Sequence, residues 1–312
     1  MARYILKRIL IMLVVLFVVS VVTFSLIHLA PGDPATLLAM ARYGVEVTPE
    51  QIEWVGREMG FDAPIHVQYF IWLGHVFHGD LGASLRTDQP VLSEIWLRLP
   101  ATLELVFAAM IIGLIVAIPL GVISATRQHS IIDNATMIGA LIGVSMPGFW
   151  LALLLILVFS VHLGWLPVCG RGGVEHLILP AITLGVSTAA INMRVMRSSM
   201  LEVLRQDYIL TARAKGLSQR VITYRHALRN ALIPVVTLTG IQFGITIGMA
   251  VIIETIFAWE GIGKLLVDSI YARDFTMIQG CVLCISALVV LSNLLVDILY
   301  AYLDPQIRYE NV

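Results

Sequence analysis

The sequence predicts an all-α membrane protein with six transmembrane helices. Of its 312 residues, 58% are hydrophobic and only 13% are charged, whereas soluble domains carry about 25% charged residues. Six apolar stretches are long enough to cross the ~30 Å hydrocarbon core, which takes about 20 helical residues. Spans of this length are helical because backbone polar groups cannot remain unpaired in lipid. The predicted spans cover residues 9–30, 101–125, 137–163, 177–194, 231–257 and 277–303.

The first apolar run follows a basic N-terminal segment. Arg3, Lys7 and Arg8 precede it, a pattern that secretory signal peptides share. The run has the length of a full span rather than that of a short signal core, and the small residue near its end, Ala30, is followed by Pro31. We therefore expect a first helix that is retained in the membrane.

Basic residues are distributed unevenly between the predicted loops. With the N-terminus in the cytoplasm, thirteen of the 20 Lys and Arg residues lie on the cytoplasmic side, eight of them in residues 194–229. Cytoplasmic loops of membrane proteins are enriched in Lys and Arg. The sequence therefore predicts one multi-pass domain over residues 1–312, with both termini and a loop over residues 198–230 in the cytoplasm.

The segment over residues 31–100 is predicted to lie on the outer, periplasmic side. It is long and polar enough to fold on the membrane surface. Within it, Thr48 is a suitable cap for a helix that starts at Pro49, because Thr is favoured at the N-cap and Pro at the first helical position.

Catalytic and nucleotide-binding motifs are missing from the sequence. The nearest string to a P-loop, at residues 261–266, lacks its spacing and its hydroxyl residue. His75 and His78 are spaced as metal ligands, but no third ligand lies nearby. A self-contained secondary transporter would need mid-membrane carboxylates and usually a repeat, and neither is found. We therefore expect a chain without catalytic residues, metal or nucleic-acid partner.

The loop over residues 198–230 is polar and lies between two spans. Leu201, Leu204 and Tyr208 recur at roughly helical spacing, and Gly216 interrupts them in the manner of a helix end. A second amphipathic helix follows. Two short helices with a glycine between them suit the docking of a protein, but a basic amphipathic helix can equally lie on anionic lipid. The residues alone leave both interpretations open.

The segment TARAKGL at residues 211–217 resembles the end of the EAA loop, through which permeases of type I ABC importers contact their ATPases. Leu210 and Thr211 stand where that loop usually has an acidic residue and an alanine, but this form is typical of the dipeptide, oligopeptide and nickel branch. Other segments resemble the same branch, in order along nearly the whole chain. They include PGDP, GDLGASLRTDQPV, LPATLEL, SMPGFWLALLLI, ILPAITLG, RHALRNALIPVV and NLLVDILYAYLDPQIR.

The resemblance implies a type I (MetI-like) core of five helices plus an extra N-terminal helix, in the cytoplasmic membrane of a bacterium or archaeon. It implies a second homologous permease, two ATPase subunits that bind the ATP and magnesium, and a periplasmic or lipid-anchored substrate-binding protein. The chain would move peptides by alternating access, and residues 205–230 would couple it to the ATPases. The expected contact residues are Thr211, Ala212, Arg213, Ala214, Lys215, Gly216 and Leu217.

Two alternatives accompany this interpretation. A permease of the same branch could carry a nickel chelate or glutathione, because the binding protein mostly sets the cargo. A protein of another class, a non-transporting platform or scaffold, would use the basic loop to bind lipid. Co-purification separates the classes, since a permease would bring its partner chains.

Polar residues inside the spans are further candidates, because they are costly in a membrane and mark function or packing. Asn192 and Arg194 lie near the inner end of the fourth span, and Glu254 lies near the outer end of the fifth. We expect them either to border the translocation path or to serve the structure. Cargo contacts cannot be assigned from the sequence.

Glycine and proline residues suggest where helices pack and bend. Gly240, Gly244 and Gly248 repeat at every fourth position, which lets another helix approach closely. This face is either a rigid packing seam within the chain or a sliding surface against the second permease. Pro147 and Gly148 permit a bend within the third span.

Overall fold

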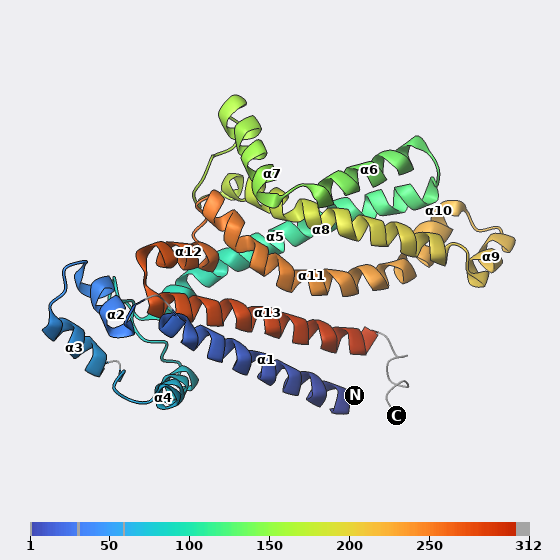
Figure 1. The fold of residues 1–312 in the computed structure, drawn as a ribbon. Helices are drawn as coiled ribbons and strands as arrows, with labels where there is room; N and C mark the ends of the chain where they lie inside the picture. Colours follow the sequence, from blue (N-terminus) through green and yellow to red (C-terminus); the bar gives the residue numbers. More distant parts are fainter. Residues whose placement is uncertain (1, 30–31, 59, 304–312) are drawn as a thin grey trace. The chain divides into compact units, whose positions relative to one another are not determined.

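The structure is a computed structural model that describes residues 2–29, 32–58 and 60–303 (Figure 1). Within these residues the regular structure is helical and no strand is formed. The chain divides into two compact units. We call Leu103–Trp259 with residues 292–303 the core unit, and the described residues of Ala2–Thr102 with Glu260–Leu291 the N-terminal unit. The predicted all-α fold is confirmed.

Five helices of the described residues are long and apolar enough to cross a membrane. Their positions agree with five of the six predicted spans, although three of them are clearly longer than predicted, because their polar ends continue the helix. These helices are α1 (Ala2–Leu29), α5 (Val91–Thr126), α8 (Val174–Val203), α11 (Leu228–Ile256) and α13 (Phe275–Leu303).

The third predicted span is a bent pair of helices rather than one straight helix. It consists of α6 (Ile131–Ser145) and α7 (Gly148–Leu155), followed by the π-helix η1 (Ile156–His162), and the two parts meet at 104°. The break lies at Met146 and Pro147, both of which are extended. Proline removes a helical backbone hydrogen bond, and it disfavours the helical conformation of the residue before it.

The central helix of the core unit is α8, which packs against α6, α7 and α11. Figure 1 shows α6, α8 and α11 running alongside one another. Glycines also let α5 approach α8 closely. A Cβ on Gly121 would lie 2.6 Å from Cβ of Met196, and a Cβ on Gly185 would lie 2.7 Å from the Ala109 carbonyl oxygen. Small residues therefore set the spacing of these helices.

The predicted outer segment forms three short helices of the N-terminal unit. They are α2 (Pro34–Tyr43), α3 (Pro49–Glu58) and α4 (Ile65–Phe77), and α12 (Ile262–Ala272) belongs to the same unit. As predicted, α3 starts at Pro49 after Thr48. The Gln51 amide donates to the Thr48 hydroxyl (3.3 Å), and the Thr48 amide donates to the Gln51 side chain (2.9 Å). This reciprocal arrangement is a capping box.

The segment GDLGASLRTDQP packs onto the start of α13. Asp274 accepts hydrogen bonds from the Ser84 hydroxyl (2.5 Å) and from the amides of Leu85 (3.2 Å) and Met277 (3.1 Å). Gly82 has a positive φ of 81°, and a Cβ there would lie 2.9 Å from a Thr276 methyl. This part of the sequence is therefore explained by packing within the N-terminal unit.

Candidate functional site

The predicted contact segment forms a helix–turn–helix at the end of α8. Helix α9 (Asp207–Ala214) is followed by a turn, by the short α10 (Gln219–Val221) and by the π-helix η2 (Ile222–Ala227), which continues directly into α11. Figure 1 shows α9 and α10 together at one end of α8 and α11. The two helices expected on either side of Gly216 are both present.

Gly216 makes the turn between the two helices. Its φ is +76°, which L-residues with side chains rarely adopt. The amides of Lys215, Gly216 and Leu217 donate to the carbonyls of Thr211 (3.0 Å), Arg213 (2.9 Å) and Ala212 (3.3 Å). These bonds satisfy the last carbonyls of α9, as a glycine C-cap does. A Cβ on Gly216 would meet no atom within 4 Å, so the requirement for glycine is conformational rather than steric.

The inner face of this loop is anchored in the hydrophobic core. Ile209 and Ala212 of α9 join Ile222 of η2 in one buried cluster with residues of α5, α8 and α11. Ala212 is only 7% exposed. The structure therefore places Ala212 inside, where it holds the loop onto the core unit. The other six expected contact residues are exposed: Thr211, Arg213, Ala214, Lys215, Gly216 and Leu217.

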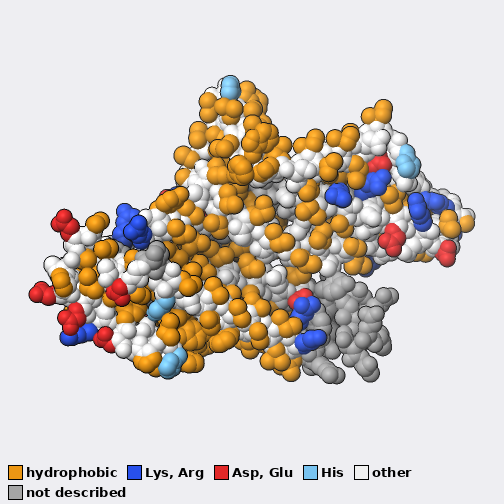
Figure 2. Space-filling view, viewed as in Figure 1, with side chains coloured by type: hydrophobic (Ala, Val, Ile, Leu, Met, Phe, Trp, Pro, Cys, Tyr) orange, Lys and Arg blue, Asp and Glu red, His pale blue; other side chains and the backbone are white. Residues whose placement is uncertain are grey.

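The outer face of the loop mixes apolar and basic side chains. Leu210 and Tyr224 are 52% and 56% exposed, between exposed basic residues. An open hollow of about 530 Å³ is lined by Arg220, Val221, Tyr224 and Arg225. Figure 2 shows basic side chains gathered at this end of the core unit, beside helices whose surface is mostly hydrophobic. We call this exposed face of α9, α10 and η2 the loop surface.

The π-helix η2 forms part of the loop surface. In a π-helix the backbone hydrogen bonds join residues five positions apart, whereas those of an α-helix join residues four positions apart. Such segments often occur at functional sites. Ile222, Thr223 and Ala227 of η2 are buried, while Tyr224 and Arg225 are exposed. The helix that carries the loop surface is thus locally irregular.

A buried ion pair joins α6 to α8 within the same unit. Asp133 is 2% exposed and accepts hydrogen bonds from Nε (2.7 Å) and Nη2 (2.8 Å) of Arg197. The Ser124 hydroxyl and the His129 amide also donate to this carboxylate. His129 has a positive φ of 64°, so Asp133 also fixes the turn between α5 and α6.

Sequence reasoning counted Arg197 among the cytoplasmic charges and missed Asp133. A signal was available, because Ser130 and Asp133 are spaced as a helix N-cap with an acidic residue three positions later, before an apolar run. The structure confirms that the Asp133 amide donates to the Ser130 hydroxyl (3.2 Å). That local pattern predicts the helix cap but not the ion pair between Asp133 and Arg197.

Two of the three candidate path residues are completely buried. Asn192 is completely buried, and its Nδ2 donates to Oε1 of Gln242 (2.5 Å) and to the Thr188 carbonyl (3.0 Å). It therefore ties α8 to α11, through a partner that sequence reasoning missed. Arg194 is exposed and Glu254 is completely buried. A place of these residues along a translocation path stays a prediction.

The glycine repeat of α11 has two kinds of surroundings. A Cβ on Gly240 would lie 2.6 Å from Val296 of α13, so this position is a packing seam within the core unit. Gly244 is buried as well. Gly248, in contrast, is exposed and has nothing within 4 Å of a Cβ. The repeat thus includes a packed position at Gly240 and an open position at Gly248.

The comparisons with known proteins agree with this architecture. Residues 117–309 match the family described as binding-protein-dependent transport system inner membrane component, and residues 1–106 match the N-terminal part of such membrane components. The chain is 43% identical over 337 residues to the dipeptide transport system permease protein DppB of Alkalihalophilus pseudofirmus. It is 43% identical over 310 residues to the glutathione transport system permease protein GsiC of Escherichia coli K12. Each alignment covers 99% of this chain and 100% of the relative.

Solved structures show the same fold. A chain of the MetNI methionine ABC transporter, solved in inward-facing conformations, matches with a TM-score of 0.54 at 22% identity, over 69% of this chain and 96% of that one. A chain of an amino acid ABC transporter matches with a TM-score of 0.50 at 15% identity, over 67% and 94%. The chain therefore belongs to the binding-protein-dependent transport family and is a multi-pass inner membrane permease of an ABC importer, with an added N-terminal helix and no enzymatic role of its own.

Proposed function

We propose that this chain and a second, homologous permease together form the path of a peptide importer, and that two ATPase subunits drive it through residues 205–230. Permeases of this family work with ATPase and substrate-binding partners. The relatives named for dipeptide and for glutathione transport support a short peptide as the cargo. In this proposal the ATP and magnesium are bound by the ATPases, and this chain carries no cofactor.

The observation that carries the proposal is the division of the loop into an anchored face and a mixed outer face. A helix that lies on lipid presents a continuous apolar side to the membrane. Here Ile209, Ala212 and Ile222 already pack into the core unit. The loop surface therefore has isolated apolar side chains between arginines, a composition that favours a protein partner, since aromatic residues and arginine are enriched at interfaces.

The anchored face also provides a route for the motion. Ile209 and Ala212 share their cluster with Met196 and Met200 of α8 and with Val122 of α5. When ATP closes the ATPase dimer, a displacement of α9 moves these helices with it, because close-packed interiors transmit strain. Hydrolysis then returns the helices to the inward-open arrangement.

We further place both termini and the loop in the cytoplasm. The support is the concentration of eight Lys and Arg residues in residues 194–229, as expected for cytoplasmic loops. The segment 32–100 then faces the periplasmic or lipid-anchored binding protein. Glutathione is the second candidate cargo, supported by the relatives named for it.

Site-directed crosslinking tests the proposed ATPase contact. The three cysteines, Cys169, Cys281 and Cys284, are first replaced by serine, and single cysteines are then introduced at Leu217 on the loop surface and at Val161 on the exposed side of η1. With the partner chains co-expressed, the Leu217 position is expected to crosslink to an ATPase and the Val161 position is not. Crosslinks of the Leu217 position to lipid alone would contradict the proposal.

A transport assay tests the cargo. Cells that express the complete transporter are supplied with radiolabelled Ala-Phe, glutathione or a nickel–histidine chelate in parallel. Uptake of the dipeptide, lost when Leu217 is replaced by Asp, is the expected result. Uptake of the nickel chelate alone would contradict a peptide cargo, but it would not contradict the contact between the loop and the ATPases.

A further inference from the structure

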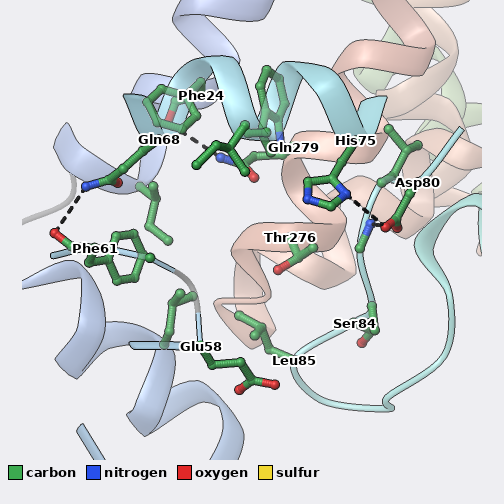
Figure 3. A pocket seen from close by; sticks show the side chains of 18 of the residues that line it. Phe24, Glu58, Phe61, Gln68, His75, Asp80, Ser84, Leu85, Thr276 and Gln279 are labelled. Atoms are coloured by element: carbon green, nitrogen blue, oxygen red, sulfur yellow. Dashed lines mark hydrogen bonds and ion pairs between the residues drawn. The ribbon is translucent and has the colours of Figure 1, made fainter. Parts of the chain in front are cut away.

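A hollow of about 450 Å³ lies within the N-terminal unit, apart from the loop surface. Its walls come from the last turns of α1, from α2 and α4, from the segment 80–88 and from the start of α13. Figure 3 shows Phe24, Phe61 and Gln279 around the same space. The volume lies within the ~300–1,000 Å³ of small-molecule sites, which are mostly apolar with a few placed polar groups.

Carboxylates outnumber fixed positive charges around this hollow. Glu58, Asp80 and Asp88 line it, and Arg42 is the one Lys or Arg among its lining residues. Arg42 is shared, since its Nη1 lies 3.0 Å from Glu58 and its Nη2 lies 3.8 Å from Asp88. Asp80 lies 3.4 Å from Nδ1 of His75 (Figure 3), which is charged only when protonated. The lining therefore favours a cation.

Three side-chain donors of the walls are already occupied. Gln68 Nε2 donates to the carbonyls of Phe61 (3.2 Å) and Ala63 (2.7 Å), and Gln279 Nε2 donates to the Thr23 carbonyl (3.3 Å). The Ser84 hydroxyl donates to Asp274. The hollow thus offers acceptors and aromatic faces, and the complementary ligand is rich in donors, positively charged and partly apolar.

An organic cation fits this lining better than a metal ion does. Among the described residues, no three His, Cys, Asp or Glu side chains are grouped so that they could hold a metal. Phe24, Phe61 and Trp72 all line the hollow, and aromatic rings attract organic ammonium groups through their π faces.

We infer that this hollow binds a primary ammonium group on a partly apolar molecule, with the ammonium at the carboxylates and the apolar part against the aromatic walls. The ammonium group can come from two sources. One is the amino terminus of a short peptide, and this source rests on the proposed peptide cargo. The other source is the ethanolamine headgroup of a lipid. Phe24 and His28 lie in the last turns of the apolar helix α1, and the end of a span lies at the depth of the headgroups, where Trp and Tyr gather.

Calorimetry on the full chain in lipid nanodiscs tests the ammonium. The probe is Ala-Phe-amide, which carries only the terminal positive charge, and its control is N-acetyl-Ala-Phe-amide, which has the same apolar body without that charge. Ala-Phe-amide is expected to bind more weakly as salt rises, because partly exposed charges are screened. The acetylated peptide is expected not to bind.

Variants locate the binding to the hollow. D80N/D88N removes two negative charges. The Gly82 amide donates to the Asp80 carboxylate at 2.8 Å, and the side-chain oxygen of an asparagine can accept the same hydrogen bond. The double variant is expected to weaken Ala-Phe-amide binding roughly tenfold, the size of two partly exposed ion pairs. D62N is the matched control, since Asp62 is exposed in the same unit and does not line the hollow. Thermal unfolding checks that the variants are folded.

Native mass spectrometry distinguishes the lipid source. Nanodiscs that mix phosphatidylethanolamine with phosphatidylglycerol are expected to leave phosphatidylethanolamine on wild type and on D62N, but not on D80N/D88N, if the headgroup is the ligand. Binding of neither amine, equal binding of the acetylated peptide, or unchanged binding by D80N/D88N would overturn the inference. Neither measurement uses ATP or partner chains, so its failure is separable from a failure of the loop crosslinking.

Discussion

The buried carboxylate of Asp133 in the core unit differs from the three carboxylates that line the hollow of the N-terminal unit. In the core unit, the Asp133 carboxylate is almost completely buried and receives four hydrogen bonds from three segments of the chain. In the N-terminal unit, the side chains of Glu58, Asp80 and Asp88 are 40%, 60% and 76% exposed. A buried charge fixes the positions of the groups that pair with it, whereas an exposed one remains able to meet a ligand.

The largest loss of stability is expected when Arg197 is replaced. Arg197→Met leaves the Asp133 carboxylate buried without its main partner, which typically costs about 3–5 kcal/mol. Arg42→Met, in the N-terminal unit, should cost about 1 kcal/mol or less, because exposed pairs contribute little. Thermal and urea unfolding of the purified chain measures both.

The double variant Asp133→Leu/Arg197→Met tests whether the unpaired buried charge causes this loss of stability. Apolar replacement of both partners of a buried pair is often neutral, so most of the lost stability should return. Equal losses for Arg197→Met and Arg42→Met would show that burial does not distinguish the two ion pairs.

A charge inside the loop should act differently from a charge on its surface. Ala212→Arg places an arginine in the cluster with Ile209 and Ile222, where an unpaired charge is strongly destabilising. We expect α9 to detach, uptake to fall to background and the spans to insert normally. Ala214→Arg, on the exposed side of the same helix, should leave the loop folded and reduce only the contact with the ATPase.

Limited proteolysis of membranes measures whether the loop is folded, and uptake of a radiolabelled peptide measures transport. New cleavage within residues 205–218 is expected for Ala212→Arg alone. Equal cleavage of the two variants would show that the buried and exposed faces of α9 have been assigned wrongly.

The turn at Gly216 should show a smaller effect. Gly216→Ala keeps the space but forces alanine to a φ of +76°, which costs about 1–2 kcal/mol. Gly139→Ala is the control, since Gly139 also has open space around a Cβ but lies within helix α6, where alanine is preferred. Uptake should fall several-fold in the first variant and be unchanged in the second. Equal uptake by both would remove the conformational requirement at the turn.

The smallest effect is expected at Arg171. Its Nη2 lies 2.8 Å from Glu104, and the two side chains are 36% and 44% exposed, so Arg171→Glu should change stability by less than about 1 kcal/mol. Arg171 lies far along the chain from the loop surface, and ATPase assembly should remain normal. Loss of the ATPases on co-purification would show that the contact extends beyond the loop.

Local patterns in the sequence predicted much of the fold. The apolar runs indicated α1, α5, α8, α11 and α13, and the Thr48–Pro49 pair indicated the start of α3. The glycine in TARAKGL indicated the turn between α9 and α10. These features depend on residues that are close together in the chain, which is why the sequence alone suffices for them.

Features that depend on distant residues were not predictable in the same way. Asp133 and Arg197 are 64 positions apart, and no local spacing links them. The burial of Ala212 depends on α5 and α8, so the resemblance could assign the segment but not the direction of each side chain. Pro147 allowed a bend, but packing sets its 104°. The hollow of the N-terminal unit is lined by several segments that are separate in the sequence.

The continuity of η2 with α11 has a mechanical consequence. Gln219–Ile256 forms one helical run of 38 residues, about 57 Å long at 1.5 Å per residue, so the helix that carries Tyr224 also carries the buried Glu254. If η2 tightened from π to α geometry, the run beyond it would shift by one residue of register. Each residue of register turns a helix by about 100°, so a local change of pitch would rotate the whole membrane portion of α11 about its own axis.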